Sequence, residues 1–111
     1  MTTTIDLVAV AKVDEIEEGQ VKVVRVGDAP VGIARVDGEL FAFADVCTHD
    51  DGPVAEGELD EFTIECPRHG ARFDIRTGRV LSLPAVVPIP VYDVVVEGDV
   101  VKVSTRPTST T

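Results

Sequence analysis

Two pairs of potential metal ligands lie in the middle of the sequence. Cys47 and His49 form a Cys-x-His pair, and after sixteen intervening residues Cys66 and His69 form a Cys-x-x-His pair. A lone cysteine is ordinarily a small core residue, and a lone histidine is usually a solvated side chain. This chain, however, holds only two of each, and all four fall into the two pairs. Composition alone would rarely produce that, so the pattern predicts one metal site.

The residue types narrow the choice of metal without settling it. Thiolate and imidazole ligands suit iron–sulfur, zinc or copper, and they exclude hard cations such as magnesium. A tetrahedral zinc site can use two cysteines and two histidines. Structural zinc loops favour cysteine pairs two to four residues apart, so the one-residue gap between Cys47 and His49 is unusual for them. A zinc-stabilised binding module without a redox role stays open at this point.

The spacing resembles that of the Rieske family of iron–sulfur proteins, in which two thiolates hold one iron and two imidazoles hold the other. The resemblance continues beyond the four ligands and covers nearly the whole chain. His69-Gly70 and Phe73-Asp74 resemble the second cluster loop of the family, and Thr77-Gly78 resembles the turn that follows it. Pro84-Ala85 resembles the proline loop that covers the cluster in this family.

By this resemblance, the chain binds one [2Fe–2S] cluster. Cys47 and Cys66 would hold the buried iron, while His49 and His69 would hold the outer iron, with their far ring nitrogens towards solvent. Two ferric ions, two sulfides and two thiolates sum to zero charge when the imidazoles are neutral, whereas four thiolates would give a doubly negative cluster. Because an electron is added more easily to a neutral cluster, histidine ligation raises the reduction potential.

Four positions favour one branch of the family. Membrane-bound Rieske proteins of respiratory complexes have a cysteine in each loop that forms a disulfide, and this chain has Gly52 and Arg68 there. Those proteins also have serine and tyrosine hydroxyls near the cluster, where this chain has Ala71 and Phe73, which cannot donate a hydrogen bond. Fewer donors, together with the carboxylates of Asp50 and Asp51, disfavour the reduced cluster. We therefore expect a reduction potential near the lower end of the Rieske range, roughly −150 mV.

The sequence indicates an electron carrier rather than an enzyme. It offers no nucleophile–base pair, phosphate loop or nucleotide fingerprint. It most resembles the soluble Rieske ferredoxins of aromatic-ring dioxygenase systems of the biphenyl, toluene and naphthalene type. That implies two partners, a flavin-dependent NAD(P)H reductase that supplies electrons and a terminal ring-hydroxylating oxygenase that receives them. A small Rieske-type subunit of an assimilatory nitrite reductase is the alternative within the family.

Composition supports a small acidic protein. The chain has 111 residues and a net charge of −10, which argues against nucleic-acid and anionic-membrane partners and favours a basic one. No secretory or membrane-spanning segment is evident, so we expect a cytoplasmic protein. Acidic residues gather around the ligand pairs as either a solvated face or a docking surface: Asp50, Asp51, Glu56, Glu58, Asp60 and Glu61.

The remaining pattern predicts an all-β fold: a Rieske-like antiparallel β-sandwich or barrel with an inserted loop-rich cluster-binding subdomain. Alternating residues predict strands over 4–11 and 20–26, the latter with a bulge or bend between Val23 and Val24, and a helical turn over 14–18. Hairpins are expected over 30–44, around Asp37-Gly38, and over 91–104. Short strands are expected at 62–65 and 71–75, and a frayed polar tail at 105–111. The expected single domain, 1–111, comprises a basal scaffold at about 1–45 and 79–106, the subdomain at about 46–78, and a tail at 107–111.

Overall fold

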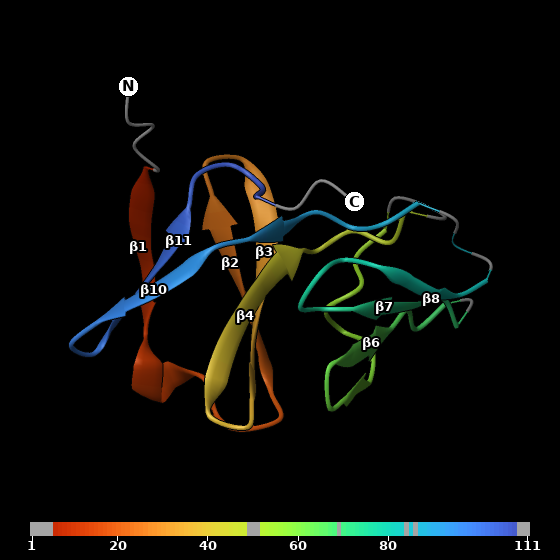
Figure 1. Cartoon of the computed structure of the whole chain (residues 1–111), viewed down its shortest axis with the longest axis horizontal. Helices are drawn as coiled ribbons and strands as arrows, with labels where there is room; N and C mark the ends of the chain where they lie inside the picture. Colours follow the sequence, from red (N-terminus) through yellow and green to blue (C-terminus); the bar gives the residue numbers. More distant parts are fainter. Residues whose placement is uncertain (1–5, 49–51, 69, 84, 86, 109–111) are drawn as a thin grey trace.

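The computed structural model describes residues 6–48, 52–68, 70–83, 85 and 87–108. Within them the chain forms three antiparallel sheets and one short 3-10 turn. Two of these sheets pack against each other, and the third forms a separate lobe beside them (Figure 1). The predicted all-β class, with a small unit inserted into an antiparallel scaffold, is therefore confirmed.

The first sheet joins the two ends of the chain. Its order is β1 (Leu7–Lys12), β11 (Val100–Ser104) and β10 (Val94–Glu97). Strands β10 and β11 form the expected hairpin, in which Glu97 pairs with Val100 across a two-residue turn. The helical turn expected after β1 is a single 3-10 turn, η1 (Val13–Glu15), which starts and ends earlier than predicted.

The second sheet has the order β2 (Val21–Val26), β3 (Ala29–Val36), β4 (Glu39–Ala44) and β9 (Val91–Tyr92). The predicted hairpin around Asp37-Gly38 is confirmed, since Val36 pairs with Glu39. Both turn residues have positive φ, 54° for Asp37 and 80° for Gly38. Positive φ at both positions is the signature of a type I′ turn, whose twist matches that of the flanking strands.

Of the bulge or bend predicted between Val23 and Val24, the bulge is wrong. The six residue pairs between β2 and β3 run without a register shift. The apolar phase changes because the sheet is covered on both sides: Val21 packs against one core, whereas Val24 packs against the other. A strand with two partly covered faces does not show the simple alternation expected of a strand with one buried face.

The strand predicted over residues 91–96 is divided between two sheets. β9 pairs with β4 in the second sheet, and β10 pairs with β11 in the first. The chain changes sheet at Asp93, whose backbone carbonyl accepts the Ser104 N–H at 3.0 Å and whose N–H donates to Ser104 Oγ at 3.1 Å. Asp93 therefore separates two strands that look continuous in the sequence.

Two apolar cores lie on opposite faces of the second sheet. One includes Ile33 and Tyr92, together with Val101 of the first sheet. The other includes Phe43, together with Ile64 and Phe73 of the small sheet. Alternate residues of β3 and β4 point into the two cores, as the pleat of a strand requires. The second sheet is thus the central layer that holds the small sheet in place.

The small sheet has the order β5 (Leu59–Asp60), β6 (Thr63–Glu65), β7 (Arg72–Asp74) and β8 (Val80–Ser82). The two strands predicted in this region are confirmed in shorter form as β6 and β7, whereas β5 and β8 were not predicted. An edge-to-face contact between Phe41 of β4 and Phe62, with ring centroids 5.6 Å apart, connects this sheet to the scaffold.

The expectation of a frayed tail is wrong for residues 105–108. The Thr105 N–H donates to the Asp6 carbonyl at 2.9 Å, and the Thr108 N–H donates to the Val91 carbonyl at 2.7 Å. These bonds hold residues 105–108 against the start of β1 and against β9. No helix within the described residues is long and apolar enough to cross a membrane.

Candidate metal centre

Two loops carry the predicted ligands, and each leaves the end of a strand. The first follows β4, and the second joins β6 to β7. Their cysteines are buried, with Cys47 0% and Cys66 1% exposed, and neither forms a disulfide. Both belong to the same apolar core as Phe43 and Phe73. His49 and His69 lie outside the described residues, as do Asp50, Asp51 and Pro84.

The two loops are closed by the same backbone interaction. The Cys47 N–H donates to the Gly52 carbonyl at 2.6 Å, and the Cys66 N–H donates to the Ala71 carbonyl at 2.7 Å. In both cases the acceptor lies five residues after the cysteine. In the second loop the Gly70 N–H also donates to the Cys66 carbonyl at 3.0 Å, and Gly70 has a φ of 78°. Gly70 thus adopts a left-handed backbone conformation, which glycine reaches without steric cost.

Side chains outside the predicted ligand set hold the first loop in place. Asp45 Oδ1 accepts the N–H groups of Val54 at 2.8 Å and Ala55 at 2.7 Å, so the end of the loop is fastened to its beginning. Thr48 Oγ1 donates to the Val87 carbonyl at 2.5 Å, which connects the loop to the proline-rich segment that precedes β9. Sequence reasoning missed both residues. The only available signal for Asp45 was a carboxylate placed directly after the apolar end of β4.

A close backbone approach is also required at Gly57. A Cβ atom at this position would lie 1.6 Å from the Glu65 carbonyl oxygen. The Glu65 N–H donates to the Glu58 carbonyl at 3.0 Å, so the chain beside Gly57 is bonded to the residue that precedes Cys66. Glycine at position 57 therefore lets the first loop pack directly onto the strand that leads to the second loop.

The surroundings of the cysteines fit an iron–sulfur group. A buried thiolate is costly unless a cation compensates its charge. The neighbouring core side chains, such as Val54, Ala71 and Phe73, are apolar, and none can donate a hydrogen bond. Two buried sulfur donors on two matching loops suit one soft metal group bound between them. Three or more potential ligands do not converge among the described residues, a set that includes neither histidine.

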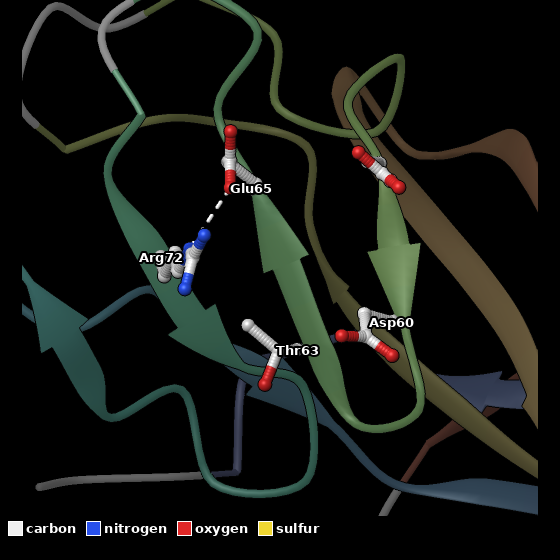
Figure 2. Close-up of a pocket in the computed structure, with 5 residues that line it drawn as sticks. Asp60, Thr63, Glu65 and Arg72 are labelled. Carbon is white, nitrogen blue, oxygen red and sulfur yellow. Dashed lines mark hydrogen bonds and ion pairs between the residues drawn. The ribbon is translucent and has the colours of Figure 1, made fainter.

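The outer face of the small sheet is acidic. A hollow of about 170 Å³ is lined by Glu58, Asp60, Thr63, Glu65 and Arg72. Figure 2 shows Asp60 and Thr63 near the turn between β5 and β6, with Glu65 and Arg72 farther along the neighbouring strands. Glu65 Oε1 accepts a hydrogen bond from Arg72 Nε at 2.9 Å. Of the six acidic residues noted around the ligand pairs, the four described ones (Glu56, Glu58, Asp60 and Glu61) are all exposed.

Three exposed apolar side chains occur along the chain from β8 to β9. They are Leu81, Leu83 and Val87, which are 46%, 75% and 53% exposed. Val87 is the residue whose carbonyl accepts the Thr48 hydroxyl, so Val87 adjoins the first cysteine loop. Large apolar side chains that are grouped on a surface often mark a binding area.

Comparison with known proteins identifies this arrangement. The family model described as "Rieske [2Fe-2S] domain" matches residues 6–93. The ferredoxin component of biphenyl 2,3-dioxygenase from Rhodococcus jostii (strain RHA1) is 42% identical over 73 residues, 66% of this chain and 68% of that protein. Ferredoxin CarAc of Metapseudomonas resinovorans is 45% identical over 80 residues, 71% of this chain and 75% of that protein.

Solved structures agree with the sequence matches. A structure titled as a complex of reduced oxygenase and oxidized ferredoxin in carbazole 1,9a-dioxygenase contains a similar chain, with a TM-score of 0.86 and 36% identity over 92% of this chain and 95% of that one. The ferredoxin of carbazole 1,9a-dioxygenase from Nocardioides aromaticivorans IC177 gives a TM-score of 0.84 and 34% identity over 87% and 95%. The chain therefore belongs to the Rieske [2Fe–2S] family, as a ferredoxin-type electron carrier with one [2Fe–2S] cluster.

Proposed function

We propose that Cys47, His49, Cys66 and His69 are the four ligands of the [2Fe–2S] cluster. The observation that carries this proposal is the matched pair of loop closures, each starting at a buried cysteine. His49 and His69 follow those cysteines by two and three residues, so in the sequence each falls between a cysteine and the residue that closes its loop. The chain holds no other cysteine or histidine.

The protein's own residues would protect this site and hold it rigid. When bound, a Rieske cluster accepts and releases one electron at a time. Asp45 and Thr48 fix the first loop, and the side chains of Ala71 and Phe73 exclude water from the cysteine side. Because these two side chains cannot donate hydrogen bonds, we expect the reduced state to be weakly stabilised, with a potential of roughly −150 mV.

We further propose that the carrier accepts electrons from a flavin-dependent NAD(P)H reductase and delivers them to a terminal ring-hydroxylating oxygenase. The names of the relatives support this role, since they are ferredoxin components of biphenyl, carbazole and p-cumate systems. One of the similar chains is a ferredoxin in complex with its oxygenase. These relatives favour a dioxygenase system over an assimilatory nitrite reductase.

Two surfaces are suited to partner binding. The exposed apolar side chains of Leu81, Leu83 and Val87 would offer a partner an apolar contact area, and because Val87 adjoins the first loop, a partner there would approach the cluster closely. The acidic hollow and the net charge of −10 would steer a basic partner by electrostatics. We expect reduction by the reductase to slow as ionic strength rises, because salt screens such steering.

Substitution of single ligands tests the site. His49→Ala or Cys66→Ala should abolish stable cluster binding, measured as iron and sulfide content and as visible absorbance. Glu56→Gln, an exposed residue in the first loop, is the control and should retain the full cluster. Full iron and sulfide retention in His49→Ala or Cys66→Ala would contradict the ligand role of that residue.

Spectroscopy tests the cluster type and its reduction potential, and a reconstituted assay tests the proposed partners. Electron paramagnetic resonance of the dithionite-reduced protein should give a lower average g value than an all-cysteine cluster, and a redox titration should give a midpoint below zero. A midpoint above zero would contradict the argument from Ala71 and Phe73. The proposed partners would be overturned if this chain supported no turnover by a dioxygenase reductase and its oxygenase but did transfer electrons to a nitrite reductase.

A further inference from the structure

We infer that Arg68 is a positioning residue that fastens the two cysteine loops to each other. Arg68 lies in the second loop, two residues after Cys66 and directly before His69, so a contact from its side chain to the first loop would connect the two ligand-bearing loops. The inference rests on the proposed ligand assignment. It adds a specific side chain, outside that ligand set, on which the lifetime of the bound cluster depends.

The contact between the loops is made by the Arg68 guanidinium. Arg68 Nη1 donates a hydrogen bond to the Pro53 carbonyl at 2.8 Å, fifteen residues earlier in the chain. A Cβ atom on Gly52 would lie 2.6 Å from Arg68 Nη2 and 2.7 Å from Cζ. The guanidinium therefore lies directly on the Gly52 backbone, and only a residue without a side chain permits this approach.

The contacted segment is the one that closes the first loop. The Gly52 carbonyl accepts the Cys47 N–H at 2.6 Å, and Pro53, whose carbonyl accepts the Arg68 bond, is the next residue. Arg68 itself lies inside the second loop, between Cys66 and its closing partner Ala71. One side chain thus spans from the closure of one cysteine loop to the interior of the other.

The chemistry of arginine suits this role. Its guanidinium is planar, stays charged throughout the ordinary pH range and donates from several nitrogens in a fixed geometry. Its acceptor here is a carbonyl, which neither titrates nor changes with redox conditions. A hydrogen bond from a charged donor contributes more than a neutral one. The contact can therefore hold the loops together in both oxidation states.

The first test compares Arg68→Ala with Arg72→Ala as purified holoproteins. Both variants lose one positive charge from the same subdomain, but the side-chain hydrogen bond of Arg72 goes to Glu65 within the small sheet. We expect Arg68→Ala to lose its cluster about tenfold faster than wild type in the presence of an iron chelator, followed by visible absorbance. Arg72→Ala should stay within about twofold. Equal rates for the two variants would overturn the inference.

A double-mutant cycle tests the contact itself. Gly52→Ala should displace the guanidinium and accelerate cluster loss, since its Cβ would collide with the end of a flexible side chain. Residues that act through one contact give non-additive effects. The Gly52→Ala/Arg68→Ala double variant should therefore lose its cluster no faster than the more labile single variant. Fully additive effects would overturn the proposed contact.

Two further readouts separate positioning from a general loss of stability. Looser loops should broaden the electron paramagnetic resonance lines of Arg68→Ala at an unchanged average g value, and Arg72→Ala should keep the wild-type line width. Arg68→Lys, which keeps the charge but loses the planar group, should recover less than half of the lost lifetime. Wild-type line width in Arg68→Ala, or full recovery by lysine, would overturn the role assigned to the guanidinium.

Failure of this inference is distinguishable from failure of the ligand assignment. Freshly isolated Arg68→Ala should still hold full iron and sulfide, because all four proposed ligands remain. His49→Ala should hold none. Full cluster content in His49→Ala would contradict the ligand set, whereas a wild-type rate of loss in Arg68→Ala would contradict only the role of Arg68.

Discussion

The scaffold and the small sheet of this protein are held together in different ways. In the scaffold, strands of up to eight residues form the central layer, where β2, β3 and β4 pair in continuous ladders, and two apolar cores cover this layer. In the small sheet, each strand has only two or three residues. The loops beside it are held by side-chain contacts from Asp45, Thr48 and Arg68. The scaffold is therefore expected to be stable by itself, and the small sheet to depend on its metal group.

Removal of the cluster should show this contrast most strongly. Strands as short as those of the small sheet are marginal without support from packing or a metal. We expect the apoprotein to lose amide hydrogen-exchange protection throughout β6 and β7, while β3 and β4 keep theirs. Exchange measured by nuclear magnetic resonance or mass spectrometry on matched apo and holo samples would show the difference.

Two outcomes of that experiment would break the contrast. Loss of protection in β3 and β4 as well would mean that the metal drives folding of the entire chain. Retained protection in β6 and β7 would mean that packing against Phe43 and Val91 of the shared core is sufficient for the small sheet. Reloading the apoprotein with iron and sulfide serves as the control, because it should restore the original exchange pattern.

A matched pair of core phenylalanines sharpens the comparison. Phe43 of β4 and Phe73 of β7 are both 0% exposed and belong to the same core. Replacement of either by alanine should cost about 3–5 kcal/mol, the usual range for a buried phenylalanine. For Phe43→Ala we expect that loss in the global free energy of unfolding. For Phe73→Ala we expect the main effect to be faster loss of the cluster. The unfolding transition of the scaffold, measured by denaturant titration with far-UV circular dichroism, should be nearly unchanged.

The scaffold was largely predictable from the sequence because its signals are local. Asp37-Gly38 specifies a two-residue turn almost alone, and the alternation of β3 and β4 follows from the period of a pleated strand. Errors arose where tertiary context decides. The change of sheet at Asp93 and the two-sided burial of β2 are set by partners distant in sequence. Local periodicity cannot reveal such partners.

The candidate site likewise has a part that the sequence predicts and a part that it does not. The ligand pattern is readable because residue type and spacing carry the chemistry, but the supporting contacts are not. In the sequence, Gly52 and Arg68 indicated only that a disulfide is impossible, whereas the structure brings them into contact. β8 pairs with β7, although it lies beyond the expected end of the subdomain at residue 78. We propose to extend the cluster-binding subdomain to Ser82, the end of β8.

Gly57, where the first loop packs onto β6 of the small sheet, offers a smaller perturbation. A Cβ atom would meet the Glu65 carbonyl oxygen at 1.6 Å, and because this is backbone rather than a flexible side chain, the strand itself must shift. We expect Gly57→Ala to destabilise the subdomain by about 1–3 kcal/mol. Cluster lifetime and exchange at β6 would measure this effect. Glu56→Ala, an exposed neighbour, is the control, and equal lifetimes in the two variants would contradict the steric argument.

The smallest expected effect is a pH dependence at Asp74. Burial alone would raise the pKa of this carboxyl group. Hydrogen bonds from the side chain and backbone N–H of Arg76, with the positive charges of Arg76 and Arg79, instead hold the pKa below its ordinary value of 3.8. A carboxylate with a lowered pKa stabilises the fold above its unfolded pKa, and this contribution is lost as the pH falls through the folded value.

Asp74→Asn isolates that charge, because the amide oxygen can still accept the Arg76 backbone N–H. The variant should be less stable than wild type by at most about 1 kcal/mol at neutral pH, since the Arg76 side chain is half exposed and water screens the pair. Other carboxylates titrate equally in both proteins, so the difference between them should shrink below about pH 4 as Asp74 becomes protonated. Thermal unfolding at matched pH values measures this difference. A constant difference from pH 7 to pH 3 would assign the role of Asp74 to its turn geometry rather than to its charge.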